Sequence, residues 1–255
     1  MLFNKISSPG KLGDGLTLEA ALRDARSATQ RDARLCAIAA LGEASAGDDR
    51  DGAERAGRLL RQLLGDDADS EIRQAAALAC GELGDRRALE LLRVIAGSDP
   101  SPAARQGAVI ALGRLGDGRD AQIVAAALED ADADVRFQAV GAIAELATNA
   151  PAARDVAETA LPARLADEDA EVRGSAAAAI GDLELGSAKD ALVALLDDSE
   201  RATRLEAAVA LSRLDDPRGA AVLADNVGRR DVGLLAAEAL YRRPHPDARD
   251  ALLAA

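Results

Sequence analysis

An arginine followed by small and apolar residues recurs along this chain at a nearly constant interval. The six arginines are Arg34, Arg73, Arg105, Arg136, Arg173 and Arg204. The intervals between them are 39, 32, 31, 37 and 31 residues, and insertions near 44–53 and 148–156 account for the two longer ones. A period of this length is typical of arrays in which one supersecondary unit is repeated and stacked.

Each repeat contains a second helical segment. These segments are 17–28, 54–64, 86–96, 118–128, 153–165, 188–196 and 217–227. A last, degenerate copy of the arginine-bearing segment starts at Gly233 and lacks the arginine. Short turns rich in Gly, Asp and Pro separate the segments, as helix ends require. The sequence therefore predicts an all-α chain of about seven helical hairpins.

The residue four positions before the arginine predicts where each arginine-bearing helix begins. It is Asp69, Ser101, Asp132 or Asp169 in four of the repeats. Such side chains accept hydrogen bonds from the free N–H groups of a helix start, and a carboxylate also offsets the positive end of the helix dipole. We therefore expect these four residues to be N-caps.

The common pattern D-x-x-V-R-x-x-A-x-x-A-[LI]-G-x-L-G-D resembles the short HEAT-like repeat of the phycobilin-lyase type. The resemblance extends from about Leu16 to Arg243. It implies a right-handed α-solenoid in which one set of helices lines an inner, concave side. The expected organisation is an N-terminal arm over 1–15 and a single solenoid over 16–255. The last repeat is degenerate (217–243), and a C-terminal helix follows at 246–255.

The 100° turn per residue of an α-helix separates a core face from a solvent-facing one. Counted from the arginine, positions −1, +3, +6, +7 and +10 form the core stripe, as in Ile72, Ala76, Ala79, Cys80 and Leu83. Position +8 is glycine in four repeats, namely Gly42, Gly81, Gly113 and Gly181. Glycine costs a helix about 1 kcal/mol relative to alanine, so its recurrence indicates close backbone contact or an unobstructed surface.

The opposite face, at positions +1 and +5, is apolar or uncharged where an indifferent surface would be charged. Its candidate partner-binding residues are Leu35, Gln74, Leu78, Gln106, Ile110, Phe137, Leu205 and Val209. Position +9, which is mostly acidic, would form a polar border, as in a protein-binding groove. Curvature of the array could instead bury this strip between neighbouring helices, and both interpretations stay open. The six repeat arginines are expected to form a structural ladder with carboxylates of adjacent repeats.

The sequence has no recognisable catalytic or metal-binding arrangement. His245 is the single histidine, between two prolines, whereas triads and zinc sites need histidine at defined positions. Cys36 and Cys80 are interpreted as small hydrophobic residues. The run 47–52 resembles a calcium loop, but Gly47 and Arg58 would stand at its first and twelfth ligand positions, which excludes an EF-hand. We expect neither a metal nor a cofactor.

The net charge restricts the classes of partner that the chain is expected to bind. The net charge is −13, and only three lysines are present. Nucleic-acid binding depends on cations that neutralise phosphates, so nucleic acids and anionic membranes are not expected partners. The acidic, lysine-poor composition fits either a GC-rich genome or adaptation to high salt. The sequence has neither a signal-peptide core nor an apolar stretch of membrane-spanning length, so the expected location is cytoplasmic.

The sequence therefore predicts a non-catalytic scaffold that binds a helix or extended peptide of another protein through the concave face. One alternative is a lyase or chaperone for a bilin chromophore, which the resemblance suggests. Such a function would be expected to draw on aromatic, basic and histidine side chains in the groove, where Phe137 alone qualifies. A shift in visible absorbance on adding free bilin would favour it. Another alternative is a structural subunit that binds through its ends. The oligomeric state is not predicted.

Overall fold

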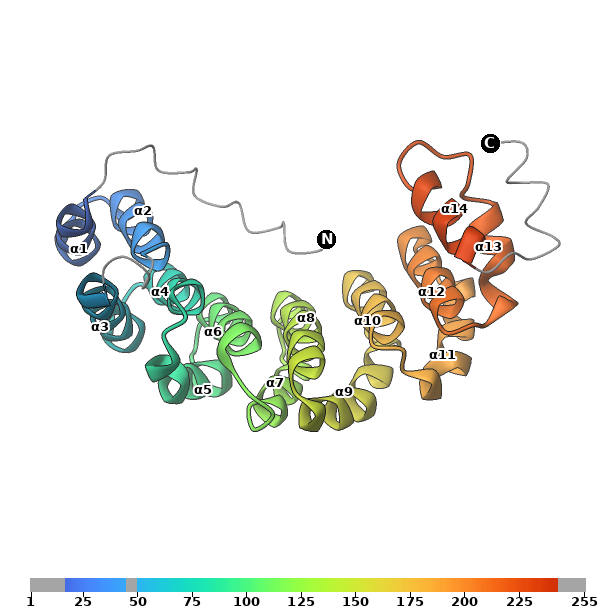
Figure 1. Ribbon diagram of the computed structural model, residues 1–255, viewed down its shortest axis with the longest axis horizontal. Coiled ribbons are helices and arrows are strands. Elements are labelled where there is room, and N and C mark those ends of the chain that lie inside the picture. Colours follow the sequence, from blue (N-terminus) through green and yellow to red (C-terminus); the bar gives the residue numbers. More distant parts are fainter. Residues whose placement is uncertain (1–16, 45–49, 243–255) are drawn as a thin grey trace. The chain divides into compact units, whose positions relative to one another are not determined.

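The computed structural model describes residues 17–44 and 50–242. Every regular element in these ranges is a helix (Figure 1). The helices fall into two compact units, one ending at Gly116 and the other beginning at Asp117. The predicted N-terminal arm (1–15), His245 and the predicted helix 246–255 lie outside the described residues. The prediction of an all-α solenoid is confirmed.

The first unit contains three helical hairpins. Its helices are α1 (Leu18–Ser27), α2 (Arg31–Gly42), α3 (Arg50–Asp66), α4 (Ser70–Leu83), α5 (Leu89–Ser98) and α6 (Pro102–Leu115). A short 3-10 turn, Arg86–Ala88, leads into α5. The helices that bear the repeat arginines, here α2, α4 and α6, are called inner helices below, and the others are called outer helices.

The second unit continues the same alternation. Its inner helices are α8 (Ala133–Asn149), α10 (Ala170–Asp182), α12 (Arg201–Arg213) and α14 (Gly233–Arg242), the last without the arginine. Its outer helices are α7 (Ala121–Ala127), α9 (Pro151–Arg164), α11 (Lys189–Ala194) and α13 (Ala220–Ala224). The 3-10 turns Gly186–Ala188, Leu195–Asp197 and Pro217–Gly219 flank the shorter outer helices.

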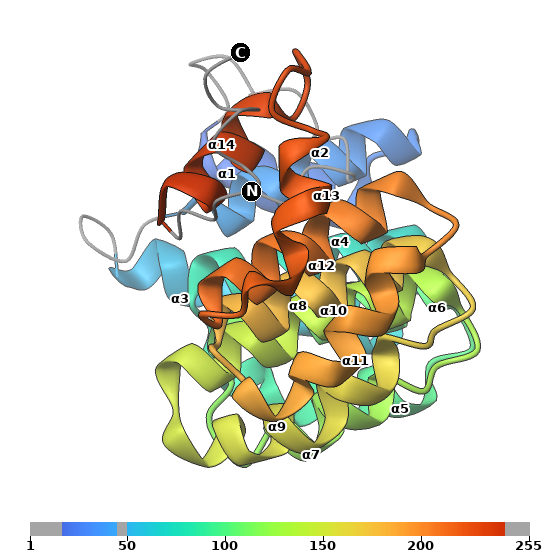
Figure 2. The same cartoon turned by 90° about the vertical axis from the view of Figure 1, so that its right-hand side faces the viewer.

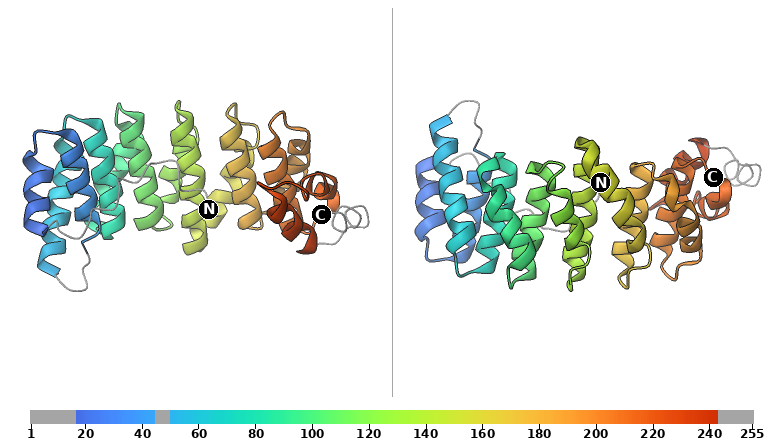
Figure 3. Two further views of the ribbon diagram at one scale, coloured as in Figure 1. Left: turned by 90° about the horizontal axis from the view of Figure 1, so that it is seen from above. Right: turned by 90° about the horizontal axis from the view of Figure 1, so that it is seen from below.

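Within each unit the inner helices form one layer and the outer helices the other. In the second unit, α8, α10 and α12 lie above α7, α9 and α11 (Figures 1 and 2). Neighbouring helices of a unit run nearly parallel or antiparallel (Figure 3). Within a unit, a helix therefore buries one side against its hairpin partner and another against a neighbouring repeat.

The core between the layers combines leucine from outer helices with alanine from inner ones. Leu60 and Leu64 of α3 and Ala76 and Cys80 of α4 have no exposed surface. In α4 the predicted stripe is buried as expected, except that Leu83 at its end is only half-buried; in α2, Ala33 is exposed and Ala40 half-buried. Small residues at +3 and +6 allow the layers to approach closely, and this is why the chain needs few aromatic residues to fill its core.

Two of the +8 glycines, Gly42 and Gly181, lie where consecutive inner helices approach each other closely. A methyl group added to Gly42 would lie 3.0 Å from the Cα of Ala79, and one added to Gly181 would lie 2.7 Å from the Cα of Ala210. In α12 the same position is Ser212, whose buried hydroxyl donates a hydrogen bond of 2.7 Å to the Ala239 carbonyl. Close helix approach therefore explains Gly42 and Gly181, as the sequence indicated, whereas Gly81 has room for a methyl group.

Three of the four predicted N-caps are confirmed. The side chains of Asp69, Asp132 and Asp169 accept hydrogen bonds from backbone N–H groups in the first turns of α4, α8 and α10. Ser101 occupies the N-cap position of α6, but its side chain accepts no such bond, and the prediction of a side-chain cap is wrong there.

The predicted insertions are partly helical. Residues 148–149 extend α8, which reaches 17 residues, and residues 151–156 form the start of α9. Residues 50–53 are the first turn of α3, while 45–49 lie outside the described residues. The extra residues in the long repeat intervals therefore lengthen helices. Of the helices described, none is both long and apolar enough to cross a membrane.

Candidate interaction surface

The repeat arginines form contacts within and between repeats. Arg136 donates hydrogen bonds of 3.0 and 2.8 Å to the two carboxylate oxygens of Asp167, in the next repeat. It also donates to the carbonyls of Asp130 and Ala131, just before its own helix. Arg73 binds Asp99 with two guanidinium nitrogens in the same way, and Arg173 binds Asp198. These are the contacts of a structural ladder.

The other three repeat arginines have different hydrogen-bond acceptors. Arg34 pairs with Asp67 and donates to the Ala25 carbonyl. Arg105 donates to the Asp99 carbonyl. Arg204 donates to the carbonyls of Asp198 and Ser199, and no carboxylate partner of it is found among the described residues. The ladder therefore loses its carboxylate where the repeat pattern itself degenerates.

The acceptors of the ladder are aspartates six residues before the next repeat arginine, and the sequence analysis missed them. They are Asp67, Asp99, Asp167 and Asp198. Each also accepts the N–H of the residue two positions later. The sixth residue before each of the arginines 73, 105, 136, 173 and 204 is aspartate, a regularity that the sequence already contained.

Pairing controls the ionisation of these aspartates. Burial by itself would raise the pKa of Asp167, but hydrogen bonds from Arg136 and from the Asp169 N–H bring that pKa below its ordinary value. The pKa of Asp198 is lowered first by its hydrogen bond from Arg173, against a smaller effect of burial. Both carboxylates are therefore charged at neutral pH, as a charge-assisted ladder requires.

The predicted partner-binding residues divide into half-buried and buried ones. Leu35, Gln74, Leu78, Gln106 and Phe137 are half-buried. Ile110, Leu205 and Val209 are buried, with 6, 4 and 3% of their surface exposed. The expectation that these three line an open groove is therefore wrong.

The burial of Leu205 and Val209 has a specific cause. Both belong to a cluster that includes Ala220 and Leu223 of α13 and Leu240 of α14. The last hairpin thus covers the face of α12 that a regular solenoid would leave open. The core interpretation is correct for this repeat, whereas the half-buried residues of α2, α4 and α8 keep part of their surface in solvent.

Polar contacts mark the surface around the half-buried strip. The Gln74 amide donates a hydrogen bond of 2.8 Å to the Gln106 amide oxygen, linking α4 to α6. Gly107 makes room for this contact, since a methyl group there would lie 2.9 Å from the Gln74 carbonyl. At position +9, Arg213 pairs with Asp182 at 2.7 Å, and Arg114 lies 3.8 Å from Glu82.

Glu206, at position +2 of α12, is a carboxylate that the sequence analysis did not select. Burial raises its pKa, with a further upward contribution from Asp182 and a downward one from Arg213. Its side chain lies near Gly174 of α10. The sequence could have revealed Glu206, because the other repeats have a small or uncharged residue at position +2.

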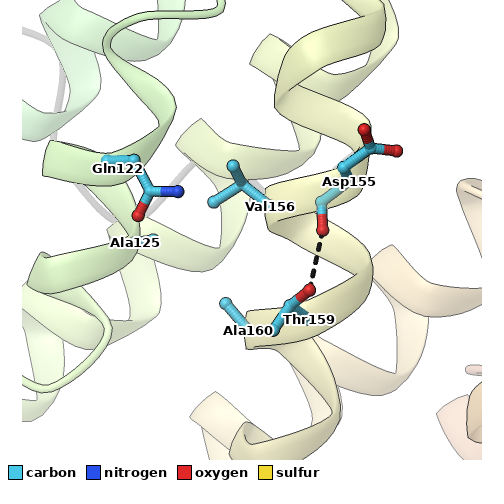
Figure 4. Close-up of a pocket in the computed structure, with 6 residues that line it drawn as sticks. All are labelled: Gln122, Ala125, Asp155, Val156, Thr159 and Ala160. Carbon is cyan, nitrogen blue, oxygen red and sulfur yellow. Dashed lines mark hydrogen bonds between the residues drawn. The ribbon is translucent and has the colours of Figure 1, made fainter.

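The outer layer of the second unit has a hollow of about 310 Å³ between α7 and α9. Figure 4 shows Gln122 and Ala125 on one side and Asp155, Val156, Thr159 and Ala160 on the other. The Thr159 hydroxyl donates a hydrogen bond of 2.9 Å to the Asp155 carbonyl of its own helix. These lining residues contain neither paired carboxylates nor a nucleophile beside a base, so they do not form a general acid–base arrangement.

The two cysteines are free. Burial raises the pKa of Cys80 to about 12, so its thiol stays protonated at neutral pH and is a poor nucleophile. Cys36 is half-buried on α2. Within the described ranges, His, Cys, Asp and Glu side chains form no group that could hold a metal ion.

The sequence matches the family model of HEAT repeats over residues 57–144, 96–163 and 157–240. The chain belongs to the HEAT-repeat family. Among curated proteins, none matches it significantly.

Solved structures of other repeat proteins share the fold. This HEAT-repeat chain is similar to YibA of Escherichia coli, with a TM-score of 0.64, 21% identity, and coverage of 96% of this chain and 94% of YibA. It is similar to the CpcE–CpcF complex of phycocyanin lyase from a Nostoc species, with a TM-score of 0.55, 20% identity, and coverage of 97 and 98%. A designed armadillo repeat protein in complex with the peptide (KR)4 gives a TM-score of 0.55, 20% identity, and coverage of 77 and 99%.

Proposed function

We propose that this HEAT-repeat protein is a non-catalytic scaffold that binds a helix or extended peptide of another protein through its inner helices. The observation that carries the proposal is that apolar side chains of the inner helices stay only half-buried, Leu35 and Leu78 in the first unit and Phe137 in the second. They stand at helix positions where solvent-facing residues are normally polar. Repeat arrays use such surfaces for binding. The designed armadillo repeat protein that shares the fold is seen with a bound peptide.

Phe137 is the strongest anchor among the half-buried residues of the second unit. Aromatic side chains bury more apolar area than other residues and dominate interface energetics. Complete burial of such a side chain contributes about 1.5–3 kcal/mol, and Phe137 in the free protein has used only part of this. Covering the remaining surface of Phe137 therefore contributes favourably to the free energy of binding, and no core contact has to be broken.

Replacing Phe137 by aspartate is expected to abolish partner binding while helical content stays unchanged, because the new carboxylate would have to lose water at the contact. The measurement is capture from the lysate of the source organism, with wild type and variant compared by mass spectrometry and helicity followed by circular dichroism. The matched control is Ala126→Asp, which adds the same charge at an exposed position of outer helix α7.

Proteins that bind wild type and Ala126→Asp but not Phe137→Asp would support the proposal. The same partners on all three chains would move the binding function away from the inner helices. Loss of helicity in Phe137→Asp would show that its contacts belong to the core.

The exposed end of the second unit favours a second candidate function, a subunit that associates through its last hairpin. Leu234 and Tyr241 of α14 are 76 and 85% exposed, which is unusual for large apolar side chains. If this surface mediates self-association, size-exclusion chromatography with light scattering should show an oligomer, which Tyr241→Glu should convert into a monomer. A wild-type monomer over the accessible concentration range would rule out self-association through this end.

The bilin-lyase alternative rests on the fold alone, since the phycocyanin lyase complex shares only 20% identity with this chain. The absorbance test with free bilin separates it from the scaffold.

A further inference from the structure

A hollow of about 490 Å³ lies between the outer helices α1 and α3 of the first unit. Four of its lining residues are arginines, Arg23, Arg26, Arg55 and Arg58, and one is a carboxylate, Glu19. In a chain whose net charge is −13, this is a conspicuous concentration of cations. We call it the arginine hollow.

Helix periodicity explains why these side chains meet. Glu19, Arg23 and Arg26 follow each other at four and three residues, which places them on one side of α1. Arg55 and Arg58 are three residues apart on α3. The two helices pack against each other, so their charged stripes form the two walls of the hollow.

The charge balance of the arginine hollow differs from that of the other outer-helix contacts. Elsewhere one arginine meets one carboxylate across the gap, as with Arg164 and Glu129 at 2.6 Å and Arg218 and Asp190 at 2.9 Å. In the arginine hollow, Glu19 is the one carboxylate among the described lining residues, beside four guanidinium groups.

Carboxylates outside the lining offset this excess only in part. Asp24 lies beside Arg23 on the same helix at 2.8 Å, and Glu54 lies 3.8 Å from Arg58. Glu54 is also shared with Arg87 at 3.2 Å. For Arg26, none of the described residues supplies a carboxylate within ion-pair distance. Arg26 therefore keeps a cationic charge that no described carboxylate neutralises.

The contact between Glu19 and Arg55 shows which chemical group the hollow accepts. Arg55 donates two hydrogen bonds, of 2.6 and 3.0 Å, to the two oxygens of the Glu19 carboxylate. This pairing lowers the pKa of Glu19. A guanidinium group matches a carboxylate in this two-point geometry, and the same match is open to a carboxylate from outside the chain.

We propose that the arginine hollow binds an acidic peptide segment of another protein, with carboxylates at intervals along it. The spread of the charges favours a peptide over a single small anion. Arg55 is bound at Glu19, and Arg26 lies seven positions after Glu19, about 10 Å along the helix. The guanidinium groups therefore line a trough instead of converging on one point. In an extended peptide, alternate side chains on one face are about 7 Å apart, which allows two carboxylates to span it.

Apolar residues add to this fit. Leu22 of α1 and Leu59 of α3 also line the hollow, Leu22 half-buried and Leu59 buried. They provide an apolar base for the aliphatic parts of a glutamate-rich segment, whereas a bare phosphate ion would gain nothing from them. The site lies on outer helices and is separate from the inner-helix surface proposed above.

The test uses the full-length chain and a fluorescently labelled octa-glutamate peptide, with binding followed by anisotropy at physiological ionic strength. There the Debye length is about 8 Å, so the overall negative charge of the protein is screened while contact pairs remain. Arg26→Glu and Arg58→Glu change exposed side chains and should each weaken binding at least about tenfold. Glu19→Gln should strengthen binding, because it removes the carboxylate that competes for Arg55.

Arg230→Glu is the matched control, since Arg230 is an exposed arginine of the second unit, outside the hollow. It should leave the affinity unchanged, and circular dichroism should show wild-type helicity for all variants. Four results would overturn the proposal: no binding by wild type, an equal loss in Arg230→Glu, weaker binding by Glu19→Gln, or displacement of the peptide by inorganic phosphate at equal concentration. The last result would identify a small-anion site.

Discussion

Replacing Arg136 by alanine is expected to destabilise the second unit by about 3 kcal/mol, at the lower end of the range for breaking a buried ion pair. The side chains of Arg136 and Asp167 are only 6 and 3% exposed. Without the guanidinium group, the Asp167 carboxylate stays buried and keeps two weaker partners. These are the Asp169 N–H at 3.0 Å and Arg164 at 3.4 Å.

The carbonyls of Asp130 and Ala131 also lose the Arg136 guanidinium group in this variant. The free energy of unfolding would be measured by urea titration followed by circular dichroism. The matched control is Arg204→Ala at the same repeat position, which removes hydrogen bonds to the carbonyls of Asp198 and Ser199. Its expected cost is about 1 kcal/mol. An equal cost for the two variants would show that the carboxylate contact adds no stability.

Replacing Gly181 by alanine is expected to destabilise the protein by up to about 2 kcal/mol, although alanine is the better helix former. The new methyl group would lie 2.7 Å from the Cα and 2.9 Å from the Cβ of Ala210, so α10 and α12 would have to move apart. Overpacking of this kind costs about 1–3 kcal/mol, which exceeds the gain of about 1 kcal/mol in helix propensity.

Gly81→Ala gives the opposite expectation at the same repeat position. Its methyl group would lie 3.4 Å from the Cα and Cβ of Ala111, an ordinary contact distance. The gain in helix propensity should therefore appear as a stabilisation of up to about 1 kcal/mol. Thermal unfolding of wild type and the two variants measures whether each substitution raises or lowers the stability. A loss of stability in both would mean that the first unit is packed as tightly as the second.

The sequence alone determined the repeat and most of its local structure. The recurring arginine set the period, and the apolar positions around it identified the buried face of each inner helix. Both follow from the pitch of the α-helix, which depends only on residue spacing. The caps Asp69, Asp132 and Asp169 were predictable for a similar reason, because an N-cap acts within one turn of its own helix. Ser101 occupies the same position but accepts no hydrogen bond from its helix, so position alone does not ensure a side-chain cap.

The tertiary structure decided which surfaces remain open. Leu205 and Val209 occupy the same helix positions as Phe137 and Leu78. The last hairpin buries Leu205 and Val209, whereas Phe137 and Leu78, in other repeats, stay half-buried. The arginine hollow likewise depends on α1 and α3 lying side by side, although α3 begins 23 positions after α1 ends. Sequence period specifies the direction in which a side chain points from its own helix. Burial depends on what packs against that side, and this is fixed only when distant segments come together.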